Sequence, residues 1–159
     1  MKILVVSDTH GRDENLEQVV MQETPFDMLI HCGDVEGREF FIEALAECPC
    51  YIVSGNNDFF SDLPREEIVE VEKNRIFVTH GHYYGVSMDA SGVADEARAC
   101  GCNVVLFGHT HKPFLEDIGG IMAVNPGSLT YPRQRGRKPS YAIMETDDNG
   151  KLTVELKYL

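Results

Sequence analysis

The sequence has no apolar stretch long enough to cross a membrane, and we expect no signal peptide in its first residues. The apolar run Ile3 to Val6 is too short for a secretory signal, and no small-residue cleavage site follows it. The five cysteines are odd in number, and the two Cys-x-Cys pairs lack the spacing of Cys-x-x-Cys zinc or redox motifs. We therefore expect a cytoplasmic protein with reduced cysteines that serve as small buried hydrophobic residues.

Positive charge is scarce, with 14 Lys and Arg against 26 Asp and Glu, and the formal net charge is −12. Such a surface repels a long phosphate backbone, so we expect no nucleic-acid polymer as a partner. A small anionic substrate stays compatible with this charge if metal ions or a local basic patch neutralise its site. The one basic patch comprises Arg133, Arg135, Arg137 and Lys138, and taken alone it indicates only a solvated loop.

The length of 159 residues and the hydrophobic content of 43% fit one globular domain spanning residues 1–159. The first part of the chain alternates short apolar runs with segments of helical periodicity. The expected strands are residues 3–6, 28–30 and 51–53, and the helical stripes between them are Leu16, Val19 and Val20, with Asp13 as N-cap, and Phe40, Phe41, Ala44 and Leu45. This β-α-β-α-β order predicts parallel strands joined by right-handed crossovers.

The second part of the chain is richer in strands. We expect a hairpin of residues 68–71 and 75–78, a helix between Asp89 and Gly101, and strands at 104–107, 114–118, 121–124, 141–145 and 152–156. Gly119-Gly120 and Asp148-Asn149-Gly150 are strong turn signals between the later strands.

Polar clusters follow five of the predicted strands, at the end where ligands of parallel sheets bind. The clusters contain Asp8 and His10, Asp34, Asn56 with Asn57 and Asp58, His80, and His109 with His111. Each cluster alone is common turn chemistry. However, four of the six histidines fall in these clusters, each at the carboxyl end of a predicted strand, and coincidence explains this distribution poorly.

The clustered side chains are oxygen and imidazole donors, which suit divalent ions such as manganese, iron, zinc or nickel. The donor set Asp8, His10, Asp34, Asn56, His80, His109 and His111 is large enough for two ions that share Asp34. Two ions roughly 3.5 to 4 Å apart hold a bridging hydroxide and clamp a phosphoryl group for in-line attack. The sequence therefore predicts a metal-dependent phosphoesterase.

The order Asp-x-His, Gly-Asp, Gly-Asn-x-Asp, His-Gly-His and Gly-His-Thr-His resembles the calcineurin-like metallophosphoesterases. The short chain and the sequence Asn125 to Ser128 are similar to the small YfcE-type phosphodiesterases in that superfamily. The resemblance covers Met1 to about Tyr141 and implies a four-layer α/β/β/α sandwich of two mixed β-sheets. It also implies two divalent ions, with manganese expected.

The resemblance further assigns the seven donors to individual ions. Asp8, His10 and His111 would hold the first ion, Asn56, His80 and His109 the second, and Asp34 both. It also implies that the turn from Asn125 to Ser128 lies near the metals, so that Arg133 could reach a substrate phosphate.

The sequence departs from the family pattern at Asn57. Many members carry a histidine here that stabilises or protonates the leaving group, whereas an asparagine can only donate a hydrogen bond to a phosphoryl oxygen. His82, Asp58 or metal-bound water could supply the proton instead. His82 is also interpreted as a partner of a ligand, and Asp58 as a ligand partner or turn former.

The leading hypothesis is a dinuclear-metal phosphodiesterase acting on a small phosphoester, expected to be a homo-oligomer by analogy with the family. A phosphomonoesterase or nucleotide pyrophosphatase on the same centre is the nearest alternative. The retromer subunit of this fold is a protein scaffold with a degraded ligand set, so a non-catalytic interaction module is a third hypothesis. All seven positions here carry competent donors, which disfavours it.

Overall fold

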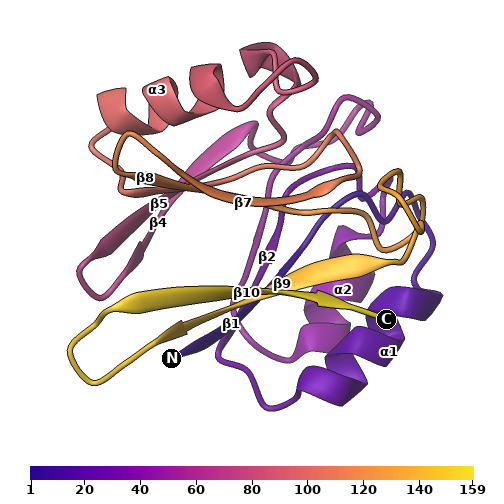
Figure 1. Ribbon diagram of the computed structural model, residues 1–159. Coiled ribbons are helices and arrows are strands. Elements are labelled where there is room, and N and C mark those ends of the chain that lie inside the picture. The colour runs from indigo at the N-terminus through magenta and orange to yellow at the C-terminus, as the bar shows by residue number, and fades with distance from the viewer.

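The computed structural model describes residues 1–159 and shows two β-sheets stacked face to face, with helices on both outer faces (Figure 1). Helices α1 and α2 cover one sheet, and α3 covers the other. The expected four-layer α/β/β/α sandwich of two mixed sheets is therefore confirmed.

The chain forms ten strands, three α-helices and one short 3₁₀ helix. In order these are β1 (Lys2–Val6), α1 (Glu14–Glu23), β2 (Met28–His31), α2 (Glu39–Ala46), β3 (Cys50–Ile52), β4 (Glu66–Val71), β5 (Asn74–Thr79), η1 (His82–Tyr84), α3 (Ser91–Ala99), β6 (Val104–Leu106), β7 (Pro113–Ile118), β8 (Ile121–Pro126), β9 (Ser140–Thr146) and β10 (Leu152–Tyr158). None of the helices has the length and apolar character needed to cross a lipid bilayer.

The first sheet has the strand order β10-β9-β1-β2-β3. Strands β1, β2 and β3 are parallel, with Val5 opposite Ile30 and Ile30 opposite Tyr51, as the β-α-β-α-β pattern predicted. Strand β9 pairs antiparallel with β1, and β10 with β9, so the chain's last two strands extend the sheet formed by its first three.

The second sheet has the strand order β4-β5-β6-β8-β7. Strands β4 and β5 form the expected hairpin, and β7 and β8 form another. Strands β5, β6 and β8 are parallel to one another, and α3 makes the crossover from β5 to β6.

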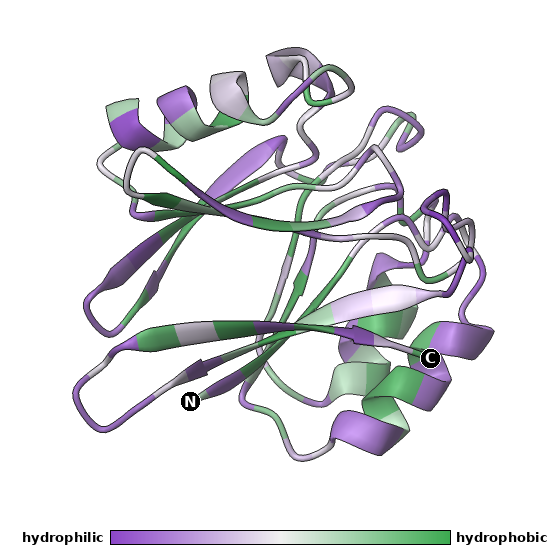
Figure 2. Ribbon diagram, viewed as in Figure 1, coloured by the Kyte–Doolittle hydropathy of each residue, from purple (hydrophilic) through white to green (hydrophobic).

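The strands are apolar on both faces because each sheet is covered on both sides. In β1, Ile3 and Val5 face the other sheet, whereas Leu4 and Val6 face α1 and α2. A third cluster joins the second sheet to α3, with Phe77 and Val105 packed against Ala94. Figure 2 shows hydrophobic colouring concentrated in the strands and on part of each helix, with hydrophilic colouring on many loops.

One expectation about the helices is wrong, whereas the predicted N-cap position of α1 is confirmed. In α2 the buried residue is Ile42, whereas Phe40 and Ala44 of the predicted stripe are exposed. A helix of eight residues presents only a narrow face to the sheet, and Ile42 occupies it. At α1, Asp13 is the N-cap residue but makes no capping hydrogen bond, because its carboxylate pairs with Arg38 instead, with Arg38 Nη2 2.6 Å from Asp13 Oδ2.

Glu23 at the end of α1 connects this helix to three strands of the first sheet. Its Oε1 accepts a hydrogen bond of 2.7 Å from the Tyr141 hydroxyl and another from Lys157, and its Oε2 lies 3.0 Å from the Lys2 ammonium. Burial raises the pKa of Glu23, but the bonds from Lys157, Tyr141 and Lys2 lower it more, from 4.5 to about 2. The ionised carboxylate therefore holds α1 against the sheet.

We predict that Glu23→Gln lowers the free energy of unfolding at pH 7 by roughly 2 to 3 kcal/mol, the worth of its depressed pKa. A carboxyl whose folded pKa lies below its unfolded value stabilises the fold above pH 4.5 and loses that contribution as the pH falls from 4.5 to 2. Urea unfolding at pH 7, 4 and 3 should show that the difference in free energy of unfolding between Glu23→Gln and wild type shrinks as the pH falls. Glu17→Gln, exposed on the same helix, is the control. A loss independent of pH would contradict this account.

Candidate metal centre

The predicted site residues meet where five strands end, in the loops after β1, β2, β3, β5 and β6. Five of the seven predicted ligands have backbone φ angles in the left-handed region, between 50° and 69°: Asp8, His10, Asp34, His109 and His111. Asp and His adopt this conformation more readily than most residues, and such strain concentrates at functional sites. The sharp turns allow several side chains to point to one place.

The carboxylate of Asp8 is fully buried directly after β1. Its Oδ2 accepts hydrogen bonds from the Ser7 hydroxyl at 2.5 Å and from the His109 N–H at 3.1 Å. Its Oδ1 has no hydrogen-bond partner, although it is fully enclosed. Burial raises the pKa of Asp8, but the imidazoles of His10, His111 and His80 lower it by more, so that it lies well below its usual range. A buried anionic oxygen therefore faces the interior of the cluster.

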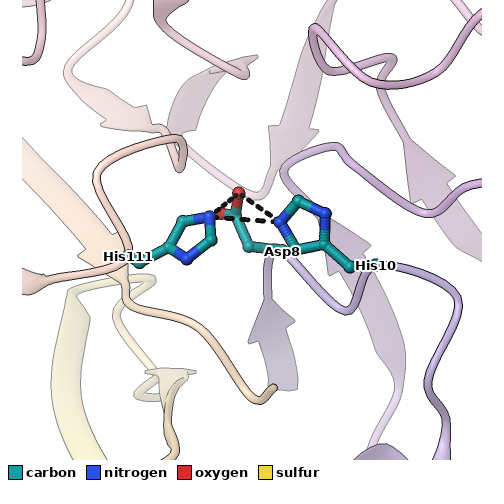
Figure 3. Close-up of side chains that lie close together, drawn as sticks. All are labelled: Asp8, His10 and His111. Carbon is teal, nitrogen blue, oxygen red and sulfur yellow. Dashed lines mark hydrogen bonds and ion pairs between the residues drawn. The ribbon is translucent and has the colours of Figure 1, made fainter. Parts of the chain in front are cut away.

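Two imidazoles flank this carboxylate, His111 on its left and His10 on its right in Figure 3. Asp8 Oδ1 lies 3.1 Å from His111 Nε2 and 3.7 Å from His10 Nε2, and the two Nε2 atoms are 3.1 Å apart. The three side chains form a group whose ligand atoms could hold one ion. They come from the loop after β1 and from the loop after β6.

The second group of ligand atoms lies beside the first and consists of Asp8, Asp34 and His80. Asp34 Oδ2 is 3.4 Å from His80 Nε2 and 3.7 Å from His10 Nε2, so this carboxylate lies between the two groups. Asp8 Oδ1 also lies 3.9 Å from His80 Nε2, and sequence reasoning had assigned Asp8 to one ion only.

Asn56 completes the second side of the cluster. Its Oδ1 is 2.9 Å from His80 Nε2 and 3.0 Å from His109 Nδ1. Burial lowers the pKa of His109, and the neighbouring charge of His80 lowers it further. All seven predicted ligands are thus brought into one cluster of polar atoms.

The outer nitrogens of three imidazoles have acceptors that fix the rings. His80 Nδ1 donates to the Cys32 carbonyl and His111 Nδ1 to the Tyr131 carbonyl, both at 2.7 Å. His10 Nδ1 lies 2.8 Å from the carboxylate of Glu36. Such outer partners orient metal-binding histidines, and they leave the Nε2 lone pairs directed at the cluster.

This arrangement fits divalent cations. The Nε2 atoms of His10, His111 and His80 converge on the Oδ1 of Asp8, at 3.7, 3.1 and 3.9 Å. Burial lowers the pKa of His10, but Asp8 and Glu36 raise it more, to about 9. The cluster therefore draws in positive charge, and nitrogen and oxygen donors at this spacing suit divalent metals.

The loop after β3 holds the Asp34 carboxylate in place. The backbone N–H of Asn57 donates to Asp34 Oδ1 and its side-chain amide to Asp34 Oδ2, both at 2.9 Å. Asp58 accepts three backbone hydrogen bonds of 2.7 to 2.8 Å, from Asp34, Gly55 and Glu36. Its oxygens are therefore committed to loop structure, which agrees with the interpretation of Asp58 as a turn former.

Two glycines allow these loops to approach the carboxylates. A Cβ at Gly55 would lie 2.1 Å from Asp34 Oδ1, and a Cβ at Gly108 would lie 2.1 Å from Ser7 Oγ and 2.6 Å from Asp8 Oδ2. No side chain larger than hydrogen fits at either position unless Asp34, or Ser7 and Asp8, move. The glycines of the Gly-Asn and Gly-His motifs are thus explained by close approach.

The two histidines outside the ligand set have different surroundings. His31 is fully buried and accepts a hydrogen bond from the Gly33 N–H at Nδ1, while its Nε2 lies 2.9 Å from Thr9 Oγ1. Burial lowers the pKa of His31 to about 4, so it is a neutral structural residue. The His82 ring lies 5.3 Å from His80 and 6.0 Å from His109, centroid to centroid, and its buried Nδ1 has no hydrogen-bond partner.

The remaining expectations concern the nearby turn and a cysteine. The turn after β8 touches the centre, because the Ser128 hydroxyl donates to the Asp8 carbonyl at 2.8 Å. The N–H of Arg133 donates to the His111 carbonyl at 2.9 Å, which places this residue at the rim. Cys32 is buried, as expected, and burial raises the pKa of its thiol.

Sequence reasoning missed Glu36 and the carbonyl of Tyr131, which orient His10 and His111. Glu36 could have been found from the sequence, because it is an acidic residue only two positions after the predicted ligand Asp34. No sequence signal marks a carbonyl oxygen, because every residue has one.

Comparison with known proteins agrees with this geometry. The family model described as the calcineurin-like phosphoesterase superfamily domain matches residues 1–149. The chain is 38% identical to the probable metallophosphoesterase YsnB of Bacillus subtilis, over 97% of this chain and 89% of YsnB. It is 30% identical to phosphodiesterase YfcE of Escherichia coli, over 92% and 89% of the two chains.

Solved structures show the same fold. A predicted phosphoesterase from Streptococcus pneumoniae superposes with a TM-score of 0.81 at 28% identity, covering 99% of this chain and 97% of the other. Vps29 of Entamoeba histolytica in complex with zinc gives a TM-score of 0.79 at 22% identity, covering 99% of each chain, a likeness of fold alone. The chain belongs to the calcineurin-like phosphoesterase superfamily and is a hydrolase that acts on phosphoester bonds.

We predict that Gly55→Ala weakens metal binding, because the new methyl group would displace the Asp34 carboxylate. Overpacking of this kind should also lower the free energy of unfolding by roughly 1 to 3 kcal/mol. Calorimetric titration with Mn²⁺ or Zn²⁺ measures the affinity.

Gly120→Ala is the control, since Gly120 has a φ of +89° in the β7-β8 turn but open space around its Cα. It should lower stability through backbone strain and leave metal affinity unchanged. Equal metal affinity in Gly55→Ala and wild type would contradict the role of the close approach.

Proposed function

We propose that this calcineurin-like phosphoesterase is a phosphodiesterase with a dinuclear centre of two divalent ions, with Mn²⁺ expected and Zn²⁺, Fe²⁺ and Ni²⁺ as alternatives. Asp8, His10 and His111 hold the first ion, and Asn56, His80 and His109 the second, with Asp34 shared. The substrate is a small phosphodiester. Relatives named phosphodiesterase support this choice over other phosphoesters.

One observation carries the proposal. The buried, unpaired Oδ1 of Asp8 lies among the inward Nε2 atoms of His10, His111 and His80, while the Asp34 carboxylate lies between the two groups. Removing these acceptors from water without a cation would cost several kcal/mol. Two adjoining groups that share the carboxylate of Asp8 provide for two adjacent positive charges.

The protein's own residues position the reaction. Two divalent ions, when bound, supply a hydroxide nucleophile at neutral pH and neutralise the phosphoryl charge. Asp34 is fixed by both amide groups of Asn57, so its oxygens keep their places between the two sides. Glu36 and the Cys32 and Tyr131 carbonyls hold the rings of His10, His80 and His111. The centre is preorganised rather than assembled by the substrate.

Substrate contacts are assigned to Asn57 and Arg133. The side-chain amide of Asn57 uses one N–H on Asp34, and its second N–H can donate to a phosphoryl oxygen. Arg133 is exposed at the rim, with its backbone held by His111, and its side chain makes no ion pair within the protein. Its guanidinium is free to bind a phosphate.

Departure of the alcohol needs a proton that Asn57 cannot supply. The three backbone hydrogen bonds to Asp58 leave it no such role. His82 has an unpartnered Nδ1 beside His80 and His109, and we assign it to the leaving-group side of the reaction.

Two other functions stay as alternatives with distinct tests. A phosphomonoesterase or nucleotide pyrophosphatase on the same centre would prefer monoesters or diphosphate bonds over diesters. A non-catalytic scaffold is suggested by the fold likeness to Vps29, and it would show no metal-dependent hydrolysis. The cytoplasm is the proposed compartment, in keeping with five free cysteines. A homo-oligomer stays an expectation by family analogy.

Metal-loaded protein should hydrolyse bis(4-nitrophenyl) phosphate and lose the activity on treatment with a chelator. We expect Asp34→Ala to reduce kcat/KM by about a thousandfold or more, because one carboxylate serves both sides of the centre. Metal analysis should show weaker binding of both ions in Asp34→Ala. Binding of the first ion should be the more affected in His10→Ala, and binding of the second in His80→Ala.

Asp95→Ala, exposed on α3, is the control and should keep wild-type activity and metal content. The proposal fails if metal-loaded wild-type protein hydrolyses no phosphodiester, or if Asp34→Ala matches wild type.

Rates should fall steeply as the leaving alcohol becomes more basic, because no histidine stands at position 57. Comparing 4-nitrophenyl, phenyl and methyl leaving groups measures this dependence. If His82 assists departure, His82→Gln should slow phenyl esters about tenfold more than 4-nitrophenyl esters, since the better leaving group needs less protonation. An equal loss for both esters would assign His82 to ligand orientation instead.

A further inference from the structure

A cavity of about 480 Å³ opens beside the metal centre. Its walls come from the segment between η1 and α3, the residue after β6, the start of β7 and Arg133. His109 and Thr110 of the loop that carries the metal ligands also line it. The cavity and the centre therefore share a wall, so one small molecule could occupy both.

One side of the cavity is apolar. The rings of Phe107 and Phe114 lie 6.0 Å apart, centroid to centroid, and are inclined at 58°. The buried side chains of Val86 and Ala90 continue this wall. Aromatic and aliphatic walls bind flat rings, and small-molecule sites commonly have volumes of roughly 300 to 1,000 Å³. The cavity thus has room for a nucleoside-sized group.

The other side of the cavity carries two cations, Lys112 and Arg133. Both are exposed, and the side chain of neither forms a hydrogen bond or ion pair with the rest of the protein. Asp89 is the one acid in the lining, and its Oδ1 already accepts hydrogen bonds of 2.9 and 2.5 Å from Ser91. In a chain of net charge −12, two unpaired cations at a cavity mark a place for an anion.

We propose that this cavity binds one ester arm of the substrate, and that this arm is a nucleoside carrying a second phosphate. The inference rests on the proposed function, because it takes the reacting phosphate at the metal centre as the anchor. The nucleobase packs against the apolar wall, on the partly exposed ring of Phe114, and the second phosphate lies against Lys112 and Arg133. The cavity has room for one nucleotide, in keeping with the expectation from the net charge that no nucleic-acid polymer binds.

Calorimetric titration of the Mn²⁺-loaded protein with three ligands tests this assignment. Methyl phosphate reaches the centre only, thymidine 5′-phosphate adds the ring, and thymidine 3′,5′-bisphosphate adds the second phosphate. We expect the dissociation constant to fall about tenfold with the ring, through apolar burial, and about tenfold again with the second phosphate, through charge-assisted hydrogen bonds.

Three variants isolate the contacts. Ser87→Trp fills the cavity from an exposed lining position and should weaken both nucleotides about tenfold while sparing methyl phosphate, because only the nucleotides enter the cavity. Lys112→Ala should reduce the affinity advantage of the bisphosphate, of which Arg133 retains a part, and Lys112→Arg should keep the full advantage. Arg135→Ala, in the same basic segment but outside the cavity, is the matched control and should change none of the three affinities.

Unchanged binding of methyl phosphate in each variant shows that the fold and the centre are intact. The proposal is overturned if the nucleotides bind no tighter than methyl phosphate, or if Ser87→Trp leaves their affinities unaltered. Hydrolysis of bis(4-nitrophenyl) phosphate by the same wild-type sample is measured in parallel. If affinity rises from methyl phosphate to the bisphosphate but no hydrolysis is seen, the cavity assignment is supported and the phosphodiesterase function is refuted. If hydrolysis is seen but affinity does not rise in this order, only the cavity assignment is refuted.

Discussion

The structure depends on the burial of acceptor atoms that face one another. Asp8 Oδ1 is enclosed without a hydrogen-bond donor, and the Nε2 atoms of His10, His80 and His111 approach it to between 3.1 and 3.9 Å. Such a cluster is unfavourable unless positive charge enters it, and it persists because the surrounding fold fixes each ring. Stability is given up at this point to create a site that attracts divalent metal.

The four-layer architecture supplies the rigidity that this cluster needs. Strands β1 and β2 bring Asp8 and Asp34 from one sheet, while β5 and β6 bring His80, His109 and His111 from the other. The apolar core between the sheets, with residues such as Val5 and Val78, sets the distance between these two halves of the centre. The metal site therefore joins the two sheets at one edge of their shared core.

Charge is distributed to match this function. The chain as a whole is strongly acidic, yet Lys112 and Arg133 lie unpaired beside the centre. An acidic surface disfavours long polyanions, while local cations and metal ions favour a small phosphoester. In the proposed cavity assignment, the apolar wall that includes Phe107 and Phe114 selects the ester arm by its shape rather than by its charge.

The sequence alone determined the β-α-β-α-β order and the ligand types, because continuous apolar runs and strand-end motifs are local signals: Ile3 to Val6 predicted a strand, and Asp8, Asp34 and His109 predicted a strand-end metal site. The four layers were implied by the family resemblance. The tertiary structure decided what depends on contacts distant in sequence. It placed Glu36 on His10, committed the amide of Asn57 to Asp34, and turned Phe40 to solvent, since the few sites on a short helix that face the sheet are set by packing. It also joined residues 86–90, 107–114 and 133 around one cavity, which no local pattern encodes because loops from separate strands meet only in the folded chain.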